Sequence, residues 1–169
     1  GGVDDRKDPP EGFLELLEKQ LKSRYYLTVG HNLKFDLLYI LCKYGFQARG
    51  TRDTMLMSQV YWAGIKQYRH SLKDVAARLG LGQVDKTEQQ SDWWQPKLTN
   101  KQINYAAKDS LLCLDVFEKL GCLINQSELT DSARIECEVL PGFVQMEFKG
   151  MPVDKELLDA NVAKYKDAE

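Results

Sequence analysis

Two carboxylates in this sequence stand where an acidic side chain needs a partner. Asp36 ends the stretch VGHNLKFD, and Asp109 lies in NYAAKDS, four residues after Tyr105. Asp109 lies on the apolar side of a helix, where an ionised carboxylate is costly unless it is paired or bound to a metal. Asp36 lies on a narrow polar strip, with Asn32 and Lys43, of a helix that is otherwise apolar. Asp36 is therefore either a ligand-binding group or a complement to its helix dipole. Asp109 is either a ligand-binding group or the acceptor of a hydrogen bond from Tyr105 or the backbone.

The segment around Asp36 predicts a strand followed by a helix. Residues 25–29 form a short apolar run, and the helix begins near Asn32 and ends at Gly45. Asn32 is a residue type that caps helix N-termini. Apolar residues fall on two opposite sides of this helix, so we expect it to be mostly buried. Asp36 then follows the carboxyl end of a strand, where open α/β sheets bind ligands.

The segment around Asp109 predicts a longer helix with clear end signals. Thr99 and Gln102 match a capping box, and Gly121 is a residue that ends helices. A helical wheel places Asp109 on the apolar side of this helix. That side also holds Tyr105, Leu112, Cys113, Val116 and Leu120.

The rest of the chain supplies further helices and one more extended segment. The loop 64–71 carries Lys66, Arg69 and His70, which form either a solvated surface or an electrostatic edge for a nucleic acid strand. The extended segment is expected at 45–53. Helices are expected at 11–23, 54–63 and 72–79, from Ser127 to Gly150 with an interruption at Pro141, and from Asp154 to Glu169.

Composition describes a globular protein without a strong charge bias. The chain of 169 residues is 43% hydrophobic and 28% charged, with a net charge of -2. Contact with phosphates must therefore come from local clusters or from metal ions. No apolar run is long enough to cross a membrane, and we expect a cytoplasmic protein. The four cysteines form no C-x-x-C pair, which argues against a structural zinc site.

The motifs together resemble one known family. VGHNLKFD, DTMLMS, SLKDVAARLGL, KTEQQSDW and LTNKQINYAAKDS resemble the 3′-5′ exonuclease domain of family A DNA polymerases, a tyrosine-type member of the DnaQ-like superfamily. The later stretch RIECEVLPGFVQMEFKGMPVDKELL resembles the segment that joins this domain to the polymerase domain. The resemblance implies an α/β fold of the RNase H-like (DnaQ-like) type, with helices around a truncated mixed sheet and a helical C-terminal extension.

The resemblance also implies a two-metal hydrolytic site. Asp36 and Asp109 match acids that bind two divalent ions, Mg²⁺ or Mn²⁺, and Tyr105 matches the tyrosine that orients the attacking water. The residues implied to contact the 3′ end of single-stranded DNA are His31, Asn32, Lys34, Phe35 and Arg69.

One part of the family pattern is missing. The D-x-E motif, which supplies two further carboxylates, should precede the helix at 11–23, and Asp4-Asp5 has neither its spacing nor its strand context. Three explanations stay open: a fragment of a larger polymerase, which we favour, a separate N-terminal chain, or a noncatalytic domain. We expect a flexible segment at 1–10, an exonuclease-like domain at 11–125 that lacks its first strands, and a helical connector at 126–169.

These observations predict an exonuclease domain that is weak or inactive as this chain stands, with a polymerase domain C-terminal to it in the parent protein. Two alternatives are a noncatalytic domain that binds single strands or acts as a scaffold, and an RNase D-like 3′-5′ exoribonuclease. The C-terminal motif disfavours the exoribonuclease, because RNase D-like enzymes are not expected to continue in this way.

Overall fold

The computed structural model describes residues 11–81, 91–93 and 98–166. Its centre is a small parallel sheet in which β1 (Thr28–Gly30) pairs with β2 (Thr51–Asp53). Thr28 is opposite Thr51 and Gly30 is opposite Asp53, so both strands end at the same edge. Helix α2 (Lys34–Tyr44) connects the two strands, as parallel pairing requires a crossover.

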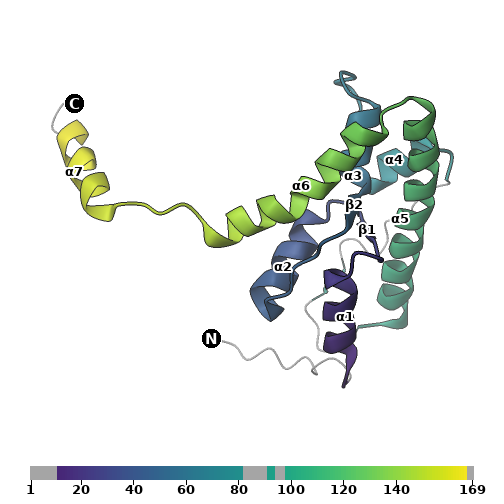
Figure 1. The fold of residues 1–169 in the computed structure, drawn as a ribbon, viewed down its shortest axis with the longest axis horizontal. Helices are drawn as coiled ribbons and strands as arrows, with labels where there is room; N and C mark the ends of the chain where they lie inside the picture. Colours follow the sequence, from purple (N-terminus) through teal and green to yellow (C-terminus); the bar gives the residue numbers. More distant parts are fainter. Residues whose placement is uncertain (1–10, 82–90, 94–97, 167–169) are drawn as a thin grey trace.

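Helices surround this sheet (Figure 1). Besides α2, they are α1 (Phe13–Lys22), α3 (Thr54–Tyr61), α4 (Leu72–Arg78), α5 (Asn100–Gln126), α6 (Thr130–Lys149) and α7 (Lys155–Lys166). Helix α6 passes close to α2, α3 and β2, whereas α5 lies beside β1, α3 and α4.

The apolar interior has two parts that share α6. In one part, Cys137 of α6 packs with side chains of α3, α4 and α5. In the other, Leu140 and Val144 of α6 pack with α1 and α2. These residues are spaced three or four apart, which puts them on one side of the helix. Helix α6 is therefore the element that joins the two halves of the core.

Helix α7 contributes nothing to this core. None of its residues is buried, and Figure 1 shows it away from the body at the end of an extended link. No helix in the described part of the chain is long and apolar enough to cross a membrane.

The expected α/β class is confirmed, with corrections to several elements. The sheet of the described residues is parallel rather than mixed. Its first strand is shorter than predicted, because the side chains of Tyr25 and Tyr26 are 96% and 59% exposed and have no sheet partner that would bury them. The predicted flexible segment 1–10 lies outside the described residues.

Two expected helix breaks do not occur. Helix α5 runs past Gly121 to Gln126, because Leu120 and Ile124 are both buried and their packing outweighs the weak helix propensity of one glycine. Helix α6 begins at Thr130 and is continuous through Pro141, held by the buried residues Leu140 and Val144 on either side. Tertiary packing thus decides both cases.

The expectation that α2 is mostly buried is wrong. Leu33, Leu37 and Leu41 face the core, while Phe35 and Tyr39 are 63% and 56% exposed. The wheel shows which residues share a side, but only neighbouring elements decide whether that side is covered. In the described structure one side of α2 packs and the opposite side faces outward.

Candidate functional site

The start of α2 is held by an acid from the next strand. Asp53 ends β2 and is 1% exposed. Its Oδ1 accepts hydrogen bonds from the backbone N–H groups of Asn32 (2.9 Å) and Met55 (2.8 Å), and its Oδ2 accepts one from Leu33 (2.8 Å). One carboxylate therefore satisfies donors at the starts of both α2 and α3, and fixes the turn that presents Asp36.

This arrangement corrects the predicted cap of α2. Asn32 has a positive φ of 60°, and the N-cap position is occupied by Leu33 without a side-chain hydrogen bond. The local signal for Asp53 as the cap of α3 was present in the Asp53-Thr54 pair at a helix start. Its second role, at α2, has no local signal, because it depends on β1 and β2 ending side by side.

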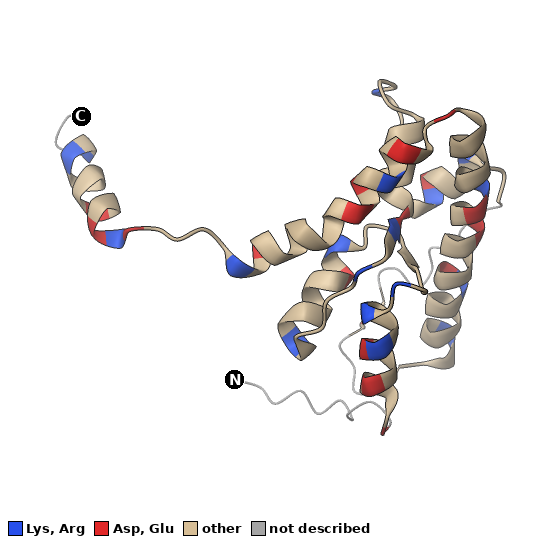
Figure 2. Ribbon diagram, in the orientation of Figure 1, with Lys and Arg blue, Asp and Glu red and all other residues tan. Residues whose placement is uncertain are grey.

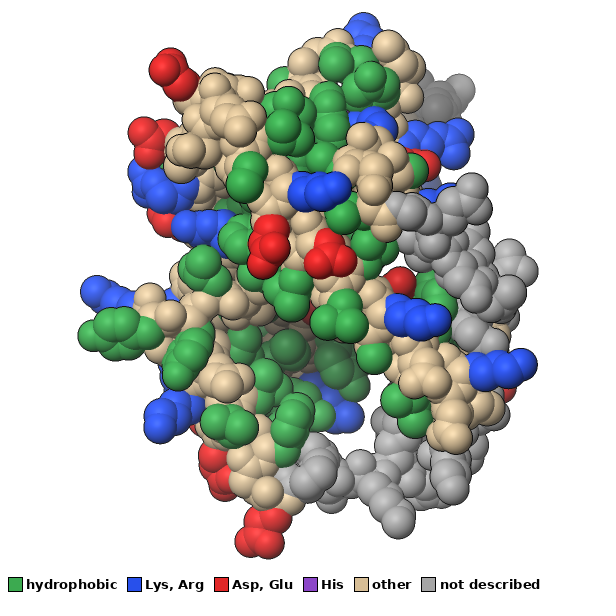
Figure 3. Space-filling model, turned by 90° about the vertical axis from the view of Figure 1, so that its right-hand side faces the viewer, with side chains coloured by type: hydrophobic (Ala, Val, Ile, Leu, Met, Phe, Trp, Pro, Cys, Tyr) green, Lys and Arg blue, Asp and Glu red, His purple; other side chains and the backbone are tan. Residues whose placement is uncertain are grey.

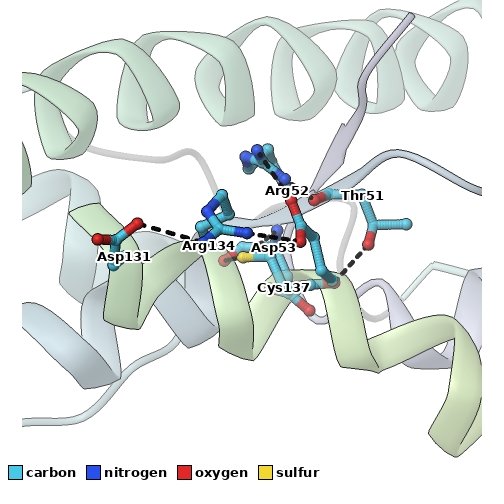
Figure 4. A network of polar contacts seen from close by, with 7 residues as sticks. Thr51, Arg52, Asp53, Asp131, Arg134 and Cys137 are labelled. Carbon is cyan, nitrogen blue, oxygen red and sulfur yellow. Dashed lines mark hydrogen bonds and ion pairs between the residues drawn. The ribbon is translucent and has the colours of Figure 1, made fainter. Parts of the chain in front are cut away.

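A polar network fixes strand β2 to helix α6 (Figure 4). The buried Cys137 lies at its centre: its carbonyl accepts a hydrogen bond from the Thr51 hydroxyl (2.5 Å), and its sulfur accepts one from the backbone N–H of Asp53 (3.4 Å). Two ion pairs lie nearby on α6, because Arg134 pairs with both Asp131 and Glu138. The contact with Cys137 therefore positions Asp53, whose carboxylate binds backbone N–H groups at the starts of α2 and α3.

His31 fastens the loop 64–71 to the same turn. Its Nε2 donates to the carbonyl of His70 (2.9 Å), and its Nδ1 lies 2.9 Å from the Thr54 hydroxyl. His70 Nδ1 is in turn 2.8 Å from the Ser58 hydroxyl. Burial lowers the pKa of both imidazoles, and the nearby Arg78 guanidinium adds to the effect at His70. Both ring nitrogens of His31 are thus engaged within the protein.

The helix that carries Asp109 begins as the sequence predicts. The Thr99 hydroxyl accepts from the N–H of Gln102 (3.2 Å), and the Gln102 side chain accepts from the N–H of Thr99 (2.8 Å), which confirms the capping box. The Gln102 amide also donates to the carbonyl of Asp92 (2.9 Å). The ring of Tyr105 lies 6.1 Å from that of Trp93. These contacts tie the start of α5 to the segment before it.

The charges of the two predicted acids both act on the thiol of Cys113. Cys113 of α5 is half-buried, and this burial raises the pKa of its thiol to about 11, with the charges of Asp109, Asp53 and Asp36 acting in the same direction. Asp109 lies one helical turn before Cys113, whereas Asp36 comes from α2. The charges of both acids therefore act on the same thiol, although the sequence separates the two acids widely.

The two acids are less buried than their helical wheels suggested. Asp109 is half-buried, and Asp36 is exposed at the surface. Partial desolvation still raises the pKa of Asp36 above its usual value, and the charge of Asp53 adds to this, while a hydrogen bond from its own backbone opposes it. The carboxylate of Asp36 is therefore accessible to a ligand and sits in negative surroundings that a cation would relieve.

The other predicted contact residues lie around the start of α2. The Lys34 ammonium is 2.7 Å from Glu147 and 5.3 Å from the centre of the exposed Phe35 ring. Asn32 is half-buried, and Arg69 is exposed on the loop that His31 fastens. Figure 2 shows basic and acidic positions interspersed along the helices. Figure 3 shows lysines and arginines separated by acidic and apolar side chains, so the cations do not form one continuous basic surface on the side that faces the viewer.

The described residues fit a divalent cation in type but not in number. Carboxylate oxygens are the ligands that Mg²⁺ and Mn²⁺ prefer, and Asp36 and Asp109 supply them. Within the ranges that the structure describes, no group of three or more His, Cys, Asp or Glu side chains is arranged to hold a metal ion. A complete metal site would need further carboxylates beside these two.

Comparison with known proteins identifies related chains. A family model described as 3′-5′ exonuclease matches residues 3–125. DNA polymerase I of Aquifex aeolicus is 34% identical over 163 residues, which cover 86% of this chain and 27% of that polymerase. DNA polymerase I of Rhizobium leguminosarum is 31% identical over 172 residues, covering 94% of this chain and 16% of that polymerase. The chain thus spans about a quarter or less of these relatives.

Among solved structures, Brucella melitensis NrnC is similar in fold. It matches with a TM-score of 0.72 and 25% identity, covering 86% of this chain and 67% of that one. The same protein has also been solved bound to pGG, with the same TM-score of 0.72 and the same identity of 25%.

Proposed function

Because the chain belongs to the 3′-5′ exonuclease family of family A DNA polymerases, we propose that it hydrolyses the 3′-terminal phosphodiester bond of single-stranded or frayed DNA. The observation that carries this proposal is the family match over residues 3–125, which includes Asp36, Tyr105 and Asp109. Asp36 is exposed on α2, Asp109 is half-buried on α5, and Tyr105 lies one turn before Asp109 on the same helix.

The roles of these side chains follow from their chemistry. Asp36 and Asp109 would each bind a divalent cation, Mg²⁺ or Mn²⁺, and the hydroxyl of Tyr105 would orient the attacking water. Such ions would stabilise the negative charge on the attacking and leaving oxygens during hydrolysis. Asn32 would support the turn, and Phe35, Lys34 and Arg69 would contact the strand. His31, whose ring nitrogens bind Thr54 and the His70 carbonyl, would hold the loop that carries Arg69.

Two carboxylates are half of the set that this chemistry uses, so we expect weak or absent hydrolysis by this chain. The test is digestion of 3′-labelled single-stranded DNA with Mn²⁺, comparing this chain with a longer version from the parent gene that includes a D-x-E strand. We expect the longer version to digest DNA and its Asp36→Ala variant to be inactive. Robust digestion by the short chain that depends on Asp36 would contradict the expected incompleteness.

Two other functions would be recognised in the same experiment. A longer version that binds single strands but does not cut them with Mn²⁺ would be a noncatalytic binding or scaffold domain. An RNase D-like exoribonuclease is favoured by one observation, the similarity in fold to NrnC, which covers 86% of this chain. Faster digestion of an RNA oligonucleotide than of the matching DNA would support that function and contradict ours.

We also propose that residues 126–169 connect this domain to a polymerase domain in a cytoplasmic parent protein. The matched relatives are DNA polymerases of which this chain covers 27% and 16%. Helix α6 has an exposed apolar row opposite its packed side, formed by Ile135, Val139, Phe143 and Met146. Oxidative footprinting should find Met146, which is 67% exposed, modified in this chain and protected in the parent protein. Equal modification in both would contradict the connection.

A further inference from the structure

The outward side of α2 carries a row of aromatic and cationic side chains that the proposed site does not use fully. Phe35, Tyr39 and Lys43 are four residues apart, so they lie in one row along the helix. The rings of Phe35 and Tyr39 are 63% and 56% exposed. We call these three residues the α2 row.

A lysine lies over each ring of the α2 row. The ammonium of Lys34 is 5.3 Å from the centre of the Phe35 ring, and that of Lys43 is 5.7 Å from the centre of the Tyr39 ring. Lys43 also donates a hydrogen bond to the Tyr39 hydroxyl (3.3 Å), and this bond raises the pKa of Lys43. The row thus combines flat apolar faces with fixed positive charge.

The fold does not require these residues. Helix α2 packs through Leu33, Leu37 and Leu41, which are 5%, 4% and 6% exposed and belong to the core beside α6. The ammonium of Lys43 contacts the aromatic side chains of Tyr39 and Tyr44. Lys34 differs, because its ammonium is already paired with Glu147. Lys43 is therefore better placed than Lys34 to bind an anion of a ligand.

The row begins at the proposed site. Asp36 lies three residues before Tyr39 and seven before Lys43, which places all three on neighbouring positions of one side of α2. A strand whose phosphate lies at Asp36 would meet Tyr39 after about 4.5 Å along the helix axis and Lys43 after about 10 Å. The row is thus continuous with the site rather than a separate surface.

We propose that the α2 row binds single-stranded nucleic acid, with a base stacked on Tyr39 and a phosphate at Lys43. Base stacking on aromatic rings is tolerant of sequence, because every base has a π face, and lysine neutralises phosphate without reading the base. A protein partner would gain little from an exposed lysine over each ring. The ligand class rests on the proposed function, and the inference extends the binding surface beyond Phe35 along α2.

The test is the binding of a fluorescent oligothymidylate of roughly 12 nucleotides, a length within the range of single-strand sites, measured by anisotropy with EDTA present. Tyr39→Ala should bind about tenfold more weakly than the unmodified chain. Tyr39→Phe, which keeps the ring, should bind within about twofold of the unmodified chain. The matched control is Tyr165→Ala, which removes a tyrosine that is 70% exposed on α7 and should leave binding unchanged.

Lys43→Gln gives an independent measure. It should weaken binding and lower the slope of log affinity against log salt concentration by about 0.7, the value for one phosphate contact on a single strand. Circular dichroism and thermal melting of each variant should match the unmodified chain, because neither side chain belongs to the core.

Some results would overturn the inference without touching the proposed function. These are unchanged binding by Tyr39→Ala, an equal loss in Tyr165→Ala, or no binding by the unmodified chain, each combined with DNA digestion by the longer version. Conversely, binding that depends on Tyr39 in a longer version that never cuts DNA would support the row and contradict the exonuclease. The two claims can therefore fail separately.

Discussion

The two helices that carry the proposed catalytic acids begin in different ways. Helix α5 begins with a capping box in which Thr99 and Gln102, three residues apart, satisfy each other's backbone donors. Helix α2 has no side-chain cap, and the N–H groups of Asn32 and Leu33 just before it bind Asp53, about twenty residues later in the chain. The start of α5 is stabilised by residues close in sequence, whereas the start of α2 is stabilised by a residue that is close only in space.

This difference shows how the site is held together. Asp53 caps α3 and holds the turn before α2 with the same carboxylate, and Cys137 of α6 fixes the strand that carries it. The position of Asp36 therefore depends on β2, α3 and α6 as well as on α2. The helix that carries Asp109, in contrast, is capped by Thr99 and Gln102 at its own start. Loss of Asp53 should disturb the site far more than loss of Thr99.

The largest expected effect is that of Asp53→Ala. Three backbone N–H groups would lose their acceptor in a place that is 1% exposed, which should lower the free energy of unfolding by about 3–5 kcal/mol. Urea denaturation followed by circular dichroism measures the change. Asp53→Asn keeps one acceptor oxygen and should lose less. A loss below that of Thr99→Ala would contradict the distinction between the two helix starts.

Thr99→Ala should be milder. Removal of an N-cap hydroxyl costs about 1 kcal/mol, and Thr99→Ser should restore most of it because serine caps equally well. The same urea denaturation applies. An effect as large as that of Asp53→Ala would show that the start of α5 also depends on distant contacts, such as the bond from Gln102 to Asp92.

The effect of the Asp109 charge can be measured at Cys113. Its pKa of about 11 results from burial and then from the charges of Asp109, Asp53 and Asp36. Asp109→Asn should therefore lower this pKa and speed alkylation of Cys113 by iodoacetamide at pH 8 by a factor of about two to five, since only the thiolate reacts. Asp115→Asn, on the same helix, is the control. An unchanged rate in Asp109→Asn would place the acid away from the thiol.

The smallest effect concerns Asp36 in metal-free buffer. Its pKa is raised, chiefly by desolvation, so the folded state holds its proton more tightly than the unfolded chain does. The favourable contribution of Asp36 to the free energy of unfolding is complete below pH 3.8, the ordinary pKa of this side chain. It is lost as the pH rises through the pKa of the folded state. Asp36→Asn should thus raise the melting temperature slightly at pH 7 and lose this advantage toward pH 4. A lower melting temperature at pH 7 would contradict the desolvation.

Features that depend on close neighbours in sequence were predictable. The family motifs, the capping box of α5 and the placement of Tyr105 and Asp109 on one side of that helix follow from spacing alone. The N-cap of α4 by Ser71 and the end of α6 at Gly150 are local in the same sense. Helical periodicity and caps extend over a few residues, so the sequence contains all of the participants side by side.

Features that depend on distant neighbours were decided by the tertiary structure. Asp53 binds the N–H groups of Asn32 and Leu33 before α2 because β1 and β2 end side by side, and the ring nitrogens of His31 contact Thr54 and His70. The outward side of α2 is apolar in sequence yet exposed, because no described element covers it. Periodicity shows which side chains share a side, but burial and remote hydrogen bonds depend on what the rest of the chain places against them.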